Sequence, residues 1–266
     1  MIFNLTTPAV SKLPKFTYTG TYTLLDDGGG NWRIKFLSSG KFTPAKDMTV
    51  DVFIVGGGGG GGSNGSVDDR YVASGGSGGY QTTIRALQLT AGTAYDVIVA
   101  SGGMAGANGS ASAFNMTTGR GGIAGDYSRS SSSLSTALTA NGVEGASGSG
   151  GAYVTSSAVG LAGNGGSDGS DGGNAVRYAG TSAEKIVARG GTGQGTTTRE
   201  FGEASGDLYS GGGAGTAKSN SQTVNGVGGA GGGGDGYDPG DPNTGGGGGG
   251  MRQGGSGIVI IRNARG

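Results

Sequence analysis

Glycine recurs in steps of three along the middle of this chain, and that spacing constrains the fold more than any other feature. The two clearest runs contain these glycines: Gly142, Gly145, Gly148, Gly151, Gly160, Gly163, Gly166, Gly169 and Gly172. A polyproline II helix has three residues per turn, so each run places glycine along one face of such a helix. Backbones can approach closely along a face without Cβ atoms and pair their outward-pointing N–H and C=O groups.

The step of three therefore predicts a bundle of short polyglycine II helices, in which these glycines are structural. At about 3.1 Å per residue, runs of this length would form helices of about 28–46 Å. Two other structures use similar compositions. Collagen needs long uninterrupted triplets and much proline, whereas these runs shift phase and the chain has 68 glycines but only 5 prolines. A disordered glycine-rich linker is the second alternative, but a linker has no reason to keep a three-residue step.

The regions on either side of these runs have the alternation of β-strands. Aromatic and aliphatic residues alternate with polar ones at 16–24 and again at 32–36, and the sequence DDGGGN at 26–31 separates the two stretches as a turn. This pattern predicts a β-hairpin. Further strands are expected at 48–55, 80–89, 95–100 and 257–262. Residues 52–55 and 258–261 are continuously apolar, so we expect them to pair at the centre of a sheet.

These patterns together predict an all-β protein with essentially no α-helix, because no segment has a sustained apolar period of 3.6 residues. Residues 1–100 are expected to form a jelly-roll-like β-sandwich, which the C-terminal strand at 257–262 completes. Residues 101–256 are expected to form the polyglycine II bundle, inserted before that last strand and carrying polar loops.

Several functional classes are disfavoured by residues that the sequence lacks. The chain contains no cysteine and no histidine, so disulfides, thiolate metal sites, thiol catalysis and histidine-based acid–base catalysis are excluded. The glycines at 56–61 formally satisfy a dinucleotide-binding motif, but no helix is expected to follow them. We therefore expect a protein that is not an enzyme and that uses neither a metal nor a cofactor.

Charge and hydropathy also limit the partners. The formal net charge is zero, which gives no basic surface for nucleic acid. No apolar run is long enough to insert into a membrane. The N-terminus lacks the charged and apolar regions of a secretory signal.

The chain resembles the glycine-rich tail proteins of bacteriophages and prophages over essentially its full length. The resemblance is carried by FNLTTPAVSKLPKFTYTG near the N-terminus, by the strand-to-glycine junction VDVFIVGGGGGGG and by the closing GGSGIVIIR. It implies a component of the virion tail or fibre tip, made in the host cytoplasm, that contacts the host surface. The alternation of glycine-rich runs and variable loops is also similar to the distal adhesins of T-even-like long tail fibres.

Polar segments with scattered tyrosine, phenylalanine and arginine separate the glycine runs, and such residues commonly anchor binding loops. The candidate receptor-binding residues are Arg70, Tyr71, Phe114, Tyr127, Tyr153, Tyr178 and Tyr237. The expected function is recognition of a glycan or protein on the bacterial surface. The expected partners also include other tail or fibre proteins, and a homotrimer is one possible assembly. The alternatives are a purely structural tail or baseplate component and an ice- or surface-binding protein.

Overall fold

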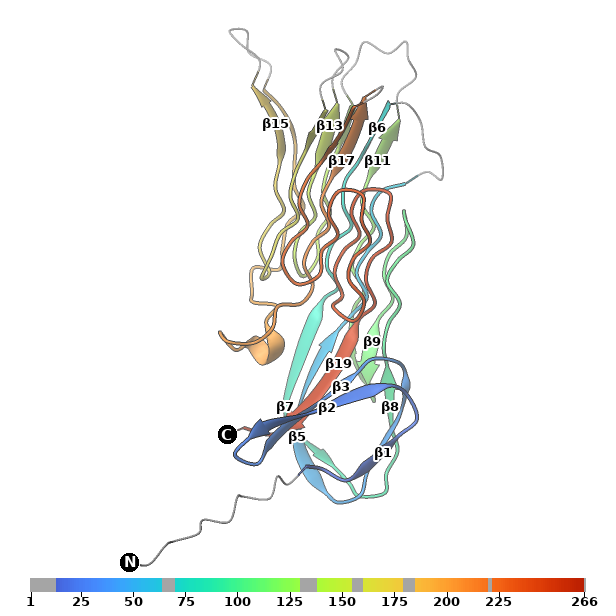
Figure 1. Cartoon of the computed structure of the whole chain (residues 1–266), viewed down its shortest axis with the longest axis vertical. Helices are drawn as coiled ribbons and strands as arrows, with labels where there is room; N and C mark the ends of the chain where they lie inside the picture. Colours follow the sequence, from blue (N-terminus) through green and yellow to red (C-terminus); the bar gives the residue numbers. More distant parts are fainter. Residues whose placement is uncertain are drawn as a thin grey trace, which may run out of the picture.

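The computed structural model describes residues 13–63, 70–129, 138–154, 160–178, 185–219 and 222–265. The molecule is elongated, and three layers follow one another along its long axis (Figure 1). A β-sandwich occupies one end, a bundle of glycine-rich segments lies in the middle, and short β-hairpins extend from the bundle at the other end. We call these the sandwich, the bundle and the distal end.

One sheet of the sandwich contains five antiparallel strands. In spatial order they are β2 (Tyr22–Gly28), β3 (Asn31–Phe36), β19 (Ile258–Asn263), β5 (Met48–Val55) and β7 (Gln81–Leu89). The expected hairpin is the pair β2–β3. The expected central pairing is also confirmed, because β19 lies between β3 and β5 with Ile258 opposite Val55 and Ile261 opposite Val52.

The second sheet packs against the first. Its strands are β1 (Phe16–Tyr18), β4 (Gly40–Pro44), β8 (Tyr95–Ile98), β9 (Ser112–Phe114) and β10 (Thr117–Gly119). Alternate residues of β3, such as Ile34 and Phe36, are buried between the sheets with Phe42 and Phe114. The apolar alternation of the sequence thus forms the core, and the prediction of an all-β sandwich is confirmed.

The bundle is organised around residues 56–62, whose backbone groups bond in three directions in turn. Successive N–H groups donate to three different antiparallel neighbours, so that every third N–H group bonds the same neighbour. These neighbours are residues 74–80, 107–110 and 252–255, and the N···O distances are 2.7–3.1 Å. The carbonyl groups accept from three parallel neighbours: 103–106, 122–125 and 248–251. This central segment is therefore a polyglycine II helix with other segments on all sides.

Close packing explains why seven consecutive residues at 56–62 are glycine. A Cβ atom built on any of them would lie 1.8–2.1 Å from a backbone oxygen of a neighbouring segment. No side chain fits there without moving a backbone. The expected division at residue 100 is wrong in this respect, since 56–62 and 74–79 already belong to the bundle and β9 and β10 return to the sandwich.

Most of the nine predicted structural glycines are required by the same packing. A Cβ would lie 2.0–2.3 Å from an atom of another segment at six of them: Gly142, Gly145, Gly148, Gly163, Gly166 and Gly172. Gly151 donates its N–H to the carbonyl of Gly173 at 3.2 Å. Gly160 opens strand β14 (Gly160–Ala162), whereas Gly169 lies in a turn with a φ of +80°, where a Cβ would lie 1.6 Å from the carbonyl oxygen of Thr196.

The predicted helix lengths are wrong because the runs fold back on themselves. The chain turns at 167–170, where Ser170 donates its N–H to the carbonyl of Ser167 at 2.9 Å, and the segments before and after this turn are antiparallel neighbours. The step of three continues through the turn in the sequence, although the helix does not. The spacing therefore marks positions without room for a side chain rather than the extent of one helix.

The distal end consists of short antiparallel strands that continue the glycine helices. One sheet contains β11 (Tyr127–Arg129), β6 (Arg70–Ala73), β17 (Thr216–Ser219) and β18 (Gln222–Asn225). A second contains β12 (Leu138–Ala140), β13 (Ala152–Val154) and β14, and a third contains β15 (Ala175–Tyr178) and β16 (Lys185–Ala188). Small side chains, including Val72, Ala152 and Ala217, form a core between the first two sheets. The polar segments expected as loops are thus partly strands.

The single helical element in the described residues is the 3-10 turn η1 (Glu200–Gly202). Its Phe201 packs with Tyr209 against Phe53 of β5 and Ile260 of β19, on the face of the sheet turned away from the sandwich core. This segment therefore covers an apolar surface that would otherwise be exposed. Within the described ranges, no helix has the length and apolarity needed to cross a membrane.

Candidate functional site

Nine strands of the distal end border segments of the chain that the structure does not describe. Strands β6 and β11–β18 have the ends that border residues 64–69, 130–137, 155–159, 179–184 and 220–221 at this end of the molecule (Figure 1). Those connecting residues lie outside the described part of the chain. The first and last described residues, Leu13 and Arg265, belong to the opposite end of the molecule. The fold therefore separates these strand ends from both ends of the described chain by the whole length of the bundle.

Three of the predicted residues meet just below this end, in a group that we call the tyrosine cluster: Tyr71, Tyr127, Tyr237 and the neighbouring Arg252. The rings of Tyr71 and Tyr127 stack with their centroids 6.2 Å apart. The phenol group of Tyr237 lies beside that of Tyr71. Burial, together with the two neighbouring tyrosines, raises the pKa of Tyr71 well above its usual range, so its hydroxyl stays protonated.

Arg252 extends the tyrosine cluster to the surface. Its guanidinium lies 4.2 Å from the ring centroid of Tyr237, and its Nε–H donates to the carbonyl oxygen of Tyr237 at 2.7 Å. Arg252 is exposed, Tyr237 is half-buried, and Tyr71 is buried on β6. The cluster thus runs from the interior of the bundle to an exposed cation. Arg252 was not among the sequence candidates, although the letters MRQ at 251–253 interrupt an otherwise glycine-rich stretch.

Three of the predicted receptor contacts are wrong because their side chains are buried. Phe114 lies in the sandwich core, where its ring stacks on Tyr95 at 6.0 Å. Tyr153 packs against Ala175 and Leu161 between the distal strands. Tyr71 is also buried, so it supports the cluster instead of reaching a partner. A polar segment indicates exposed aromatic residues, whereas these segments form strands with an inner face.

Arg70 and Tyr178 occupy the ends of strands at the distal end. The backbone of Arg70 pairs with that of Ser219, and the backbone of Tyr178 pairs with that of Lys185. Both positions therefore border hairpin connections. Their side chains lie outside the described part of the structure, and their role stays a prediction.

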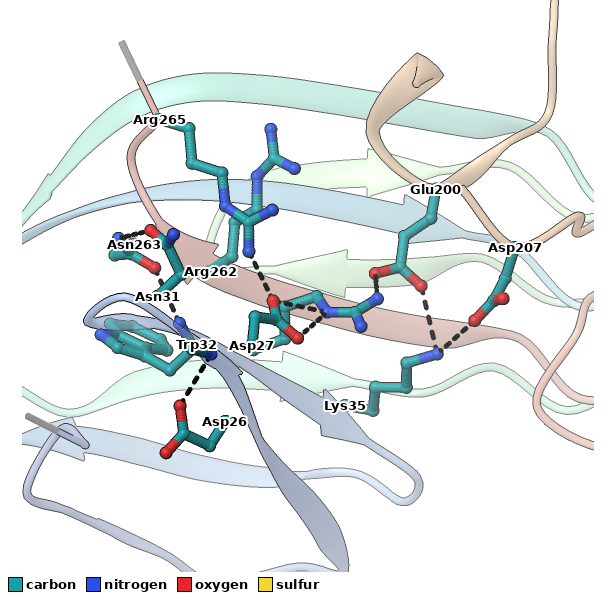
Figure 2. Close-up of polar contacts among 12 residues, drawn as sticks. Asp26, Asp27, Asn31, Trp32, Lys35, Glu200, Asp207, Arg262, Asn263 and Arg265 are labelled. Carbon is teal, nitrogen blue, oxygen red and sulfur yellow. Dashed lines mark hydrogen bonds and ion pairs between the residues drawn. The ribbon is translucent and has the colours of Figure 1, made fainter. Parts of the chain in front are cut away.

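A network of ion pairs occupies the opposite end of the molecule, where η1 contacts the sandwich (Figure 2). Glu200, 2% exposed, accepts from Arg33 at 2.6 Å and pairs with Lys35 at 3.1 Å. Lys35 also pairs with Asp207 at 3.0 Å. Asp27 pairs with Arg33 at 2.9 Å and with Arg265. Each carboxylate named here has a cation beside it, so the network joins the segment around η1 to β2, β3 and the C-terminal residues.

A second buried carboxylate, Asp51, completes this connection. It accepts from Arg262 at 3.1 Å, from Arg85 at 3.0 Å and from the N–H of Ala86 at 3.1 Å. Arg262 also lies 4.0 Å from the ring centroid of Phe201. Burial alone would raise the pKa of Asp51, but these hydrogen bonds and the guanidinium charges hold it below its usual value. We call this whole network the charged clasp and assign it a structural role, since its charges are satisfied internally.

The described residues contain no group of three or more acidic, histidine or cysteine side chains arranged to hold a metal ion. The tyrosine cluster and the charged clasp are two polar arrangements among the described residues. The first lies beside the distal end and reaches the surface, whereas the second joins η1 to the sandwich around a polar cavity of about 190 Å³.

A family model described as a glycine-rich domain matches residues 37–264. The matched range includes the bundle, the distal end and the sandwich strands other than β1, β2 and β3. A search of curated proteins found no similar sequence. Because the match covers most of the chain, this protein belongs to the glycine-rich domain family.

Proposed function

We propose that this protein is a receptor-binding component of a bacteriophage tail or tail-fibre tip, which attaches to the surface of a bacterial host without catalysing a reaction. The observation that carries the proposal is that strands β6 and β11–β18 border five polar sequence segments at one end of the molecule, remote from both ends of the described chain. An adhesin needs this polarity, because one end must face the host while the other joins the virion.

The bundle supplies the rigidity that such a role requires. Residues 56–62 bond to neighbours through every N–H and nearly every C=O, so the segments that carry the hairpins are fixed relative to one another. Binding by loops on a rigid scaffold loses less conformational entropy than binding by free loops. The composition of the connections suits the role, since SVDDR, RSSSSLST and RYAGTSAEK combine small polar residues with arginine and tyrosine.

The experiment is binding of the purified, fluorescently labelled chain to a panel of bacterial strains, followed by competition with phage adsorption on each strain that binds. We expect saturable binding to a restricted set of strains and inhibition of adsorption there. A structural tail component would bind no strain and would leave adsorption unchanged.

Matched variants test whether the distal end is responsible. Replacing residues 179–184 or 130–137 by Gly–Ser sequences of equal length should abolish cell binding and leave the melting temperature within a few degrees of wild type. The control replaces Met116, in the β9–β10 turn of the sandwich, by serine; Met116 is 92% exposed. Equal loss of binding in the control would contradict the assignment to the distal end.

A further inference from the structure

A groove opens on the surface beside Arg252, apart from the hairpins of the distal end. Its volume is about 280 Å³, and its lining residues are Met104, Ala105, Pro239, Met251, Arg252 and Gln253. These residues come from separate turns of the bundle, which backbone hydrogen bonds through residues 56–62 hold together. The groove is therefore a fixed feature of the bundle, and its lining is mainly apolar.

Met251 occupies a backbone conformation that favours glycine. Its φ is +64°, in a turn that the N–H of Arg252 closes by donating to the carbonyl of Gly249 at 2.9 Å. Positive φ is unfavourable for a residue with a Cβ, and strained residues of this kind concentrate at ligand-binding sites. Six other residues with a Cβ also have positive φ in the described part of the chain, among them Phe201, which packs against β5 and β19. Met251 differs in that its side chain lines the surface groove.

A second methionine lies on the same groove. Met104 is 67% exposed, an unusual environment for a large apolar side chain in a chain otherwise rich in glycine and serine. Methionine has a flexible, polarisable side chain that adapts to apolar partners of irregular shape. Met104, Met251 and Pro239 thus form an apolar surface that can cover one large side chain of a partner.

Arg252 adds a single, oriented positive charge to this surface. The Nε–H of Arg252 donates to the carbonyl oxygen of Tyr237, and the guanidinium lies over the Tyr237 ring. Tyr237 lies in turn beside the buried Tyr71. Among the described residues, no hydrogen bond or ion pair to the terminal guanidinium nitrogens is found. A guanidinium with its remaining donors available is suited to a carboxylate, which it can bind through two parallel hydrogen bonds.

We propose that this groove binds a loop of a host surface protein in which an apolar side chain stands next to a carboxylate. The apolar side chain packs between Met104 and Met251, and the carboxylate accepts from Arg252. This inference rests on the proposed function and names a partner class for it. A polypeptide suits the groove better than a glycan does, because a sugar would need several hydrogen-bonding side chains and the lining offers mainly Arg252 and Gln253.

The test uses the full chain labelled with ¹³C in its methionine methyl groups, of which the sequence contains five. The probes are cyclic hexapeptides that present Phe-Asp or Leu-Asp, with matched peptides that present Phe-Asn or Leu-Asn. We expect the aspartate peptides to shift the methyl signals of Met104 and Met251 and to leave Met116 unchanged. The asparagine peptides should bind at least tenfold more weakly, because they cannot form the ion pair.

Variants of the groove sharpen the result. Met251→Gly should reduce peptide binding at least tenfold while the melting temperature stays equal or rises, because glycine relieves the strained φ. Arg252→Lys should reduce binding similarly by removing the bidentate donor. Arg120→Lys is the control, since Arg120 is an exposed arginine whose guanidinium lies 4.6 Å from the Tyr80 ring centroid, away from the groove. It should bind the peptides as wild type does.

Some outcomes overturn the inference. Equal shifts with aspartate and asparagine peptides would remove the role of Arg252, and shifts produced only by glucuronic acid or glucose would make the site a sugar site. No shift at Met104 or Met251 with any peptide would reject the groove. If Met251→Gly binds cells normally, the proposed adhesin function stands and the groove proposal fails. If the peptides bind as expected but no strain is bound, the groove stands and the adhesin function fails.

Discussion

The sandwich and the bundle exclude water by different means. In the sandwich, Phe36, Ile54, Phe114 and Val259 fill the space between two sheets with side chains. In the bundle, residues 56–62 have no side chain, and their surroundings are the backbones of other segments. The sandwich core is held by apolar burial and packing, whereas the bundle is held by hydrogen bonds that backbone contact makes possible.

This difference predicts that the sandwich core tolerates a change in side-chain size, whereas the bundle does not tolerate the addition of a side chain. A side-chain core accepts a smaller residue at a cost that grows with the volume removed. A backbone core leaves no room for a single added methyl group, because the neighbours that would have to move are carbonyl groups bonded to other segments. Four experiments test this contrast, and they follow from the largest expected effect to the smallest.

Gly59→Ala should have the largest effect. The added Cβ would lie 2.0 Å from the carbonyl oxygen of Ile123, so the bundle must open around it. We expect a loss of more than about 4 kcal/mol in the free energy of unfolding, measured by urea denaturation. In Gly160→Ala, the control, the nearest atom is the Cβ of Ala217 at 3.3 Å, and the loss should be below about 1 kcal/mol. Similar values for the two variants would contradict the requirement for a bare backbone.

Ile261→Ala should produce the graded response of a side-chain core. Ile261 is fully buried on β19, and its replacement should cost about 3 kcal/mol. Ile261→Val should cost only about 1 kcal/mol, because one methylene is removed. If the valine variant were as unstable as the alanine variant, the sandwich would share the intolerance of the bundle. Calorimetric melting of both variants provides the measurement.

Glu200→Ala tests the charged clasp that joins the two regions. It leaves Arg33 and Lys35 without their shared buried partner, and we expect a loss of about 2 kcal/mol. Hydrogen exchange should increase around η1 and leave residues 56–62 protected. Asp207→Ala is the matched control, because Asp207 is 66% exposed and a pair of this kind contributes less than about 1 kcal/mol. If hydrogen exchange in Glu200→Ala increased equally across the bundle, the clasp would not stabilise the region around η1 alone.

Acid should weaken the clasp by a smaller amount. The pKa values of Asp27 and Asp51 are lower in the folded state, because hydrogen bonds and neighbouring guanidiniums outweigh the opposing effect of burial. The unfolded chain therefore binds more protons as the pH falls below about 5, so this stability is present at neutral pH and is lost at lower pH. Urea titrations between pH 7 and pH 3 should show the decline. The decline should be shallower in Asp51→Asn, and an unchanged slope would contradict the role of this carboxylate.

The sequence predicts the sandwich better than the bundle. Alternation at 32–36 and the apolar runs at 52–55 and 258–261 are local patterns, and they determine which residues face the core and which strands pair. The place of residues 56–62 in the bundle could not be predicted, because consecutive glycines show no periodicity and are equally typical of a linker.

The tyrosine cluster was predicted in part. Tyr71, Tyr127 and Tyr237 are each predicted as aromatic residues in polar segments, and no local pattern indicates that they meet. Their contact depends on the pairing of β6 with β11 and on the turn that carries Tyr237. The burial of Phe114 and Tyr153 could not be predicted either, because three-residue strands such as β9 and β13 are too short to show an alternation.

Backbone bonding in the bundle also affects how hairpins can be exchanged between related genes during evolution. Each hairpin at the distal end enters and leaves through glycine-rich segments that present nearly the same bare surface to their neighbours. Exchange of a hairpin between related genes, with crossovers inside the glycine codons, would bring in new connecting residues without introducing a mismatched core. Inheritance in such a lineage would conserve the glycines and diversify everything between them.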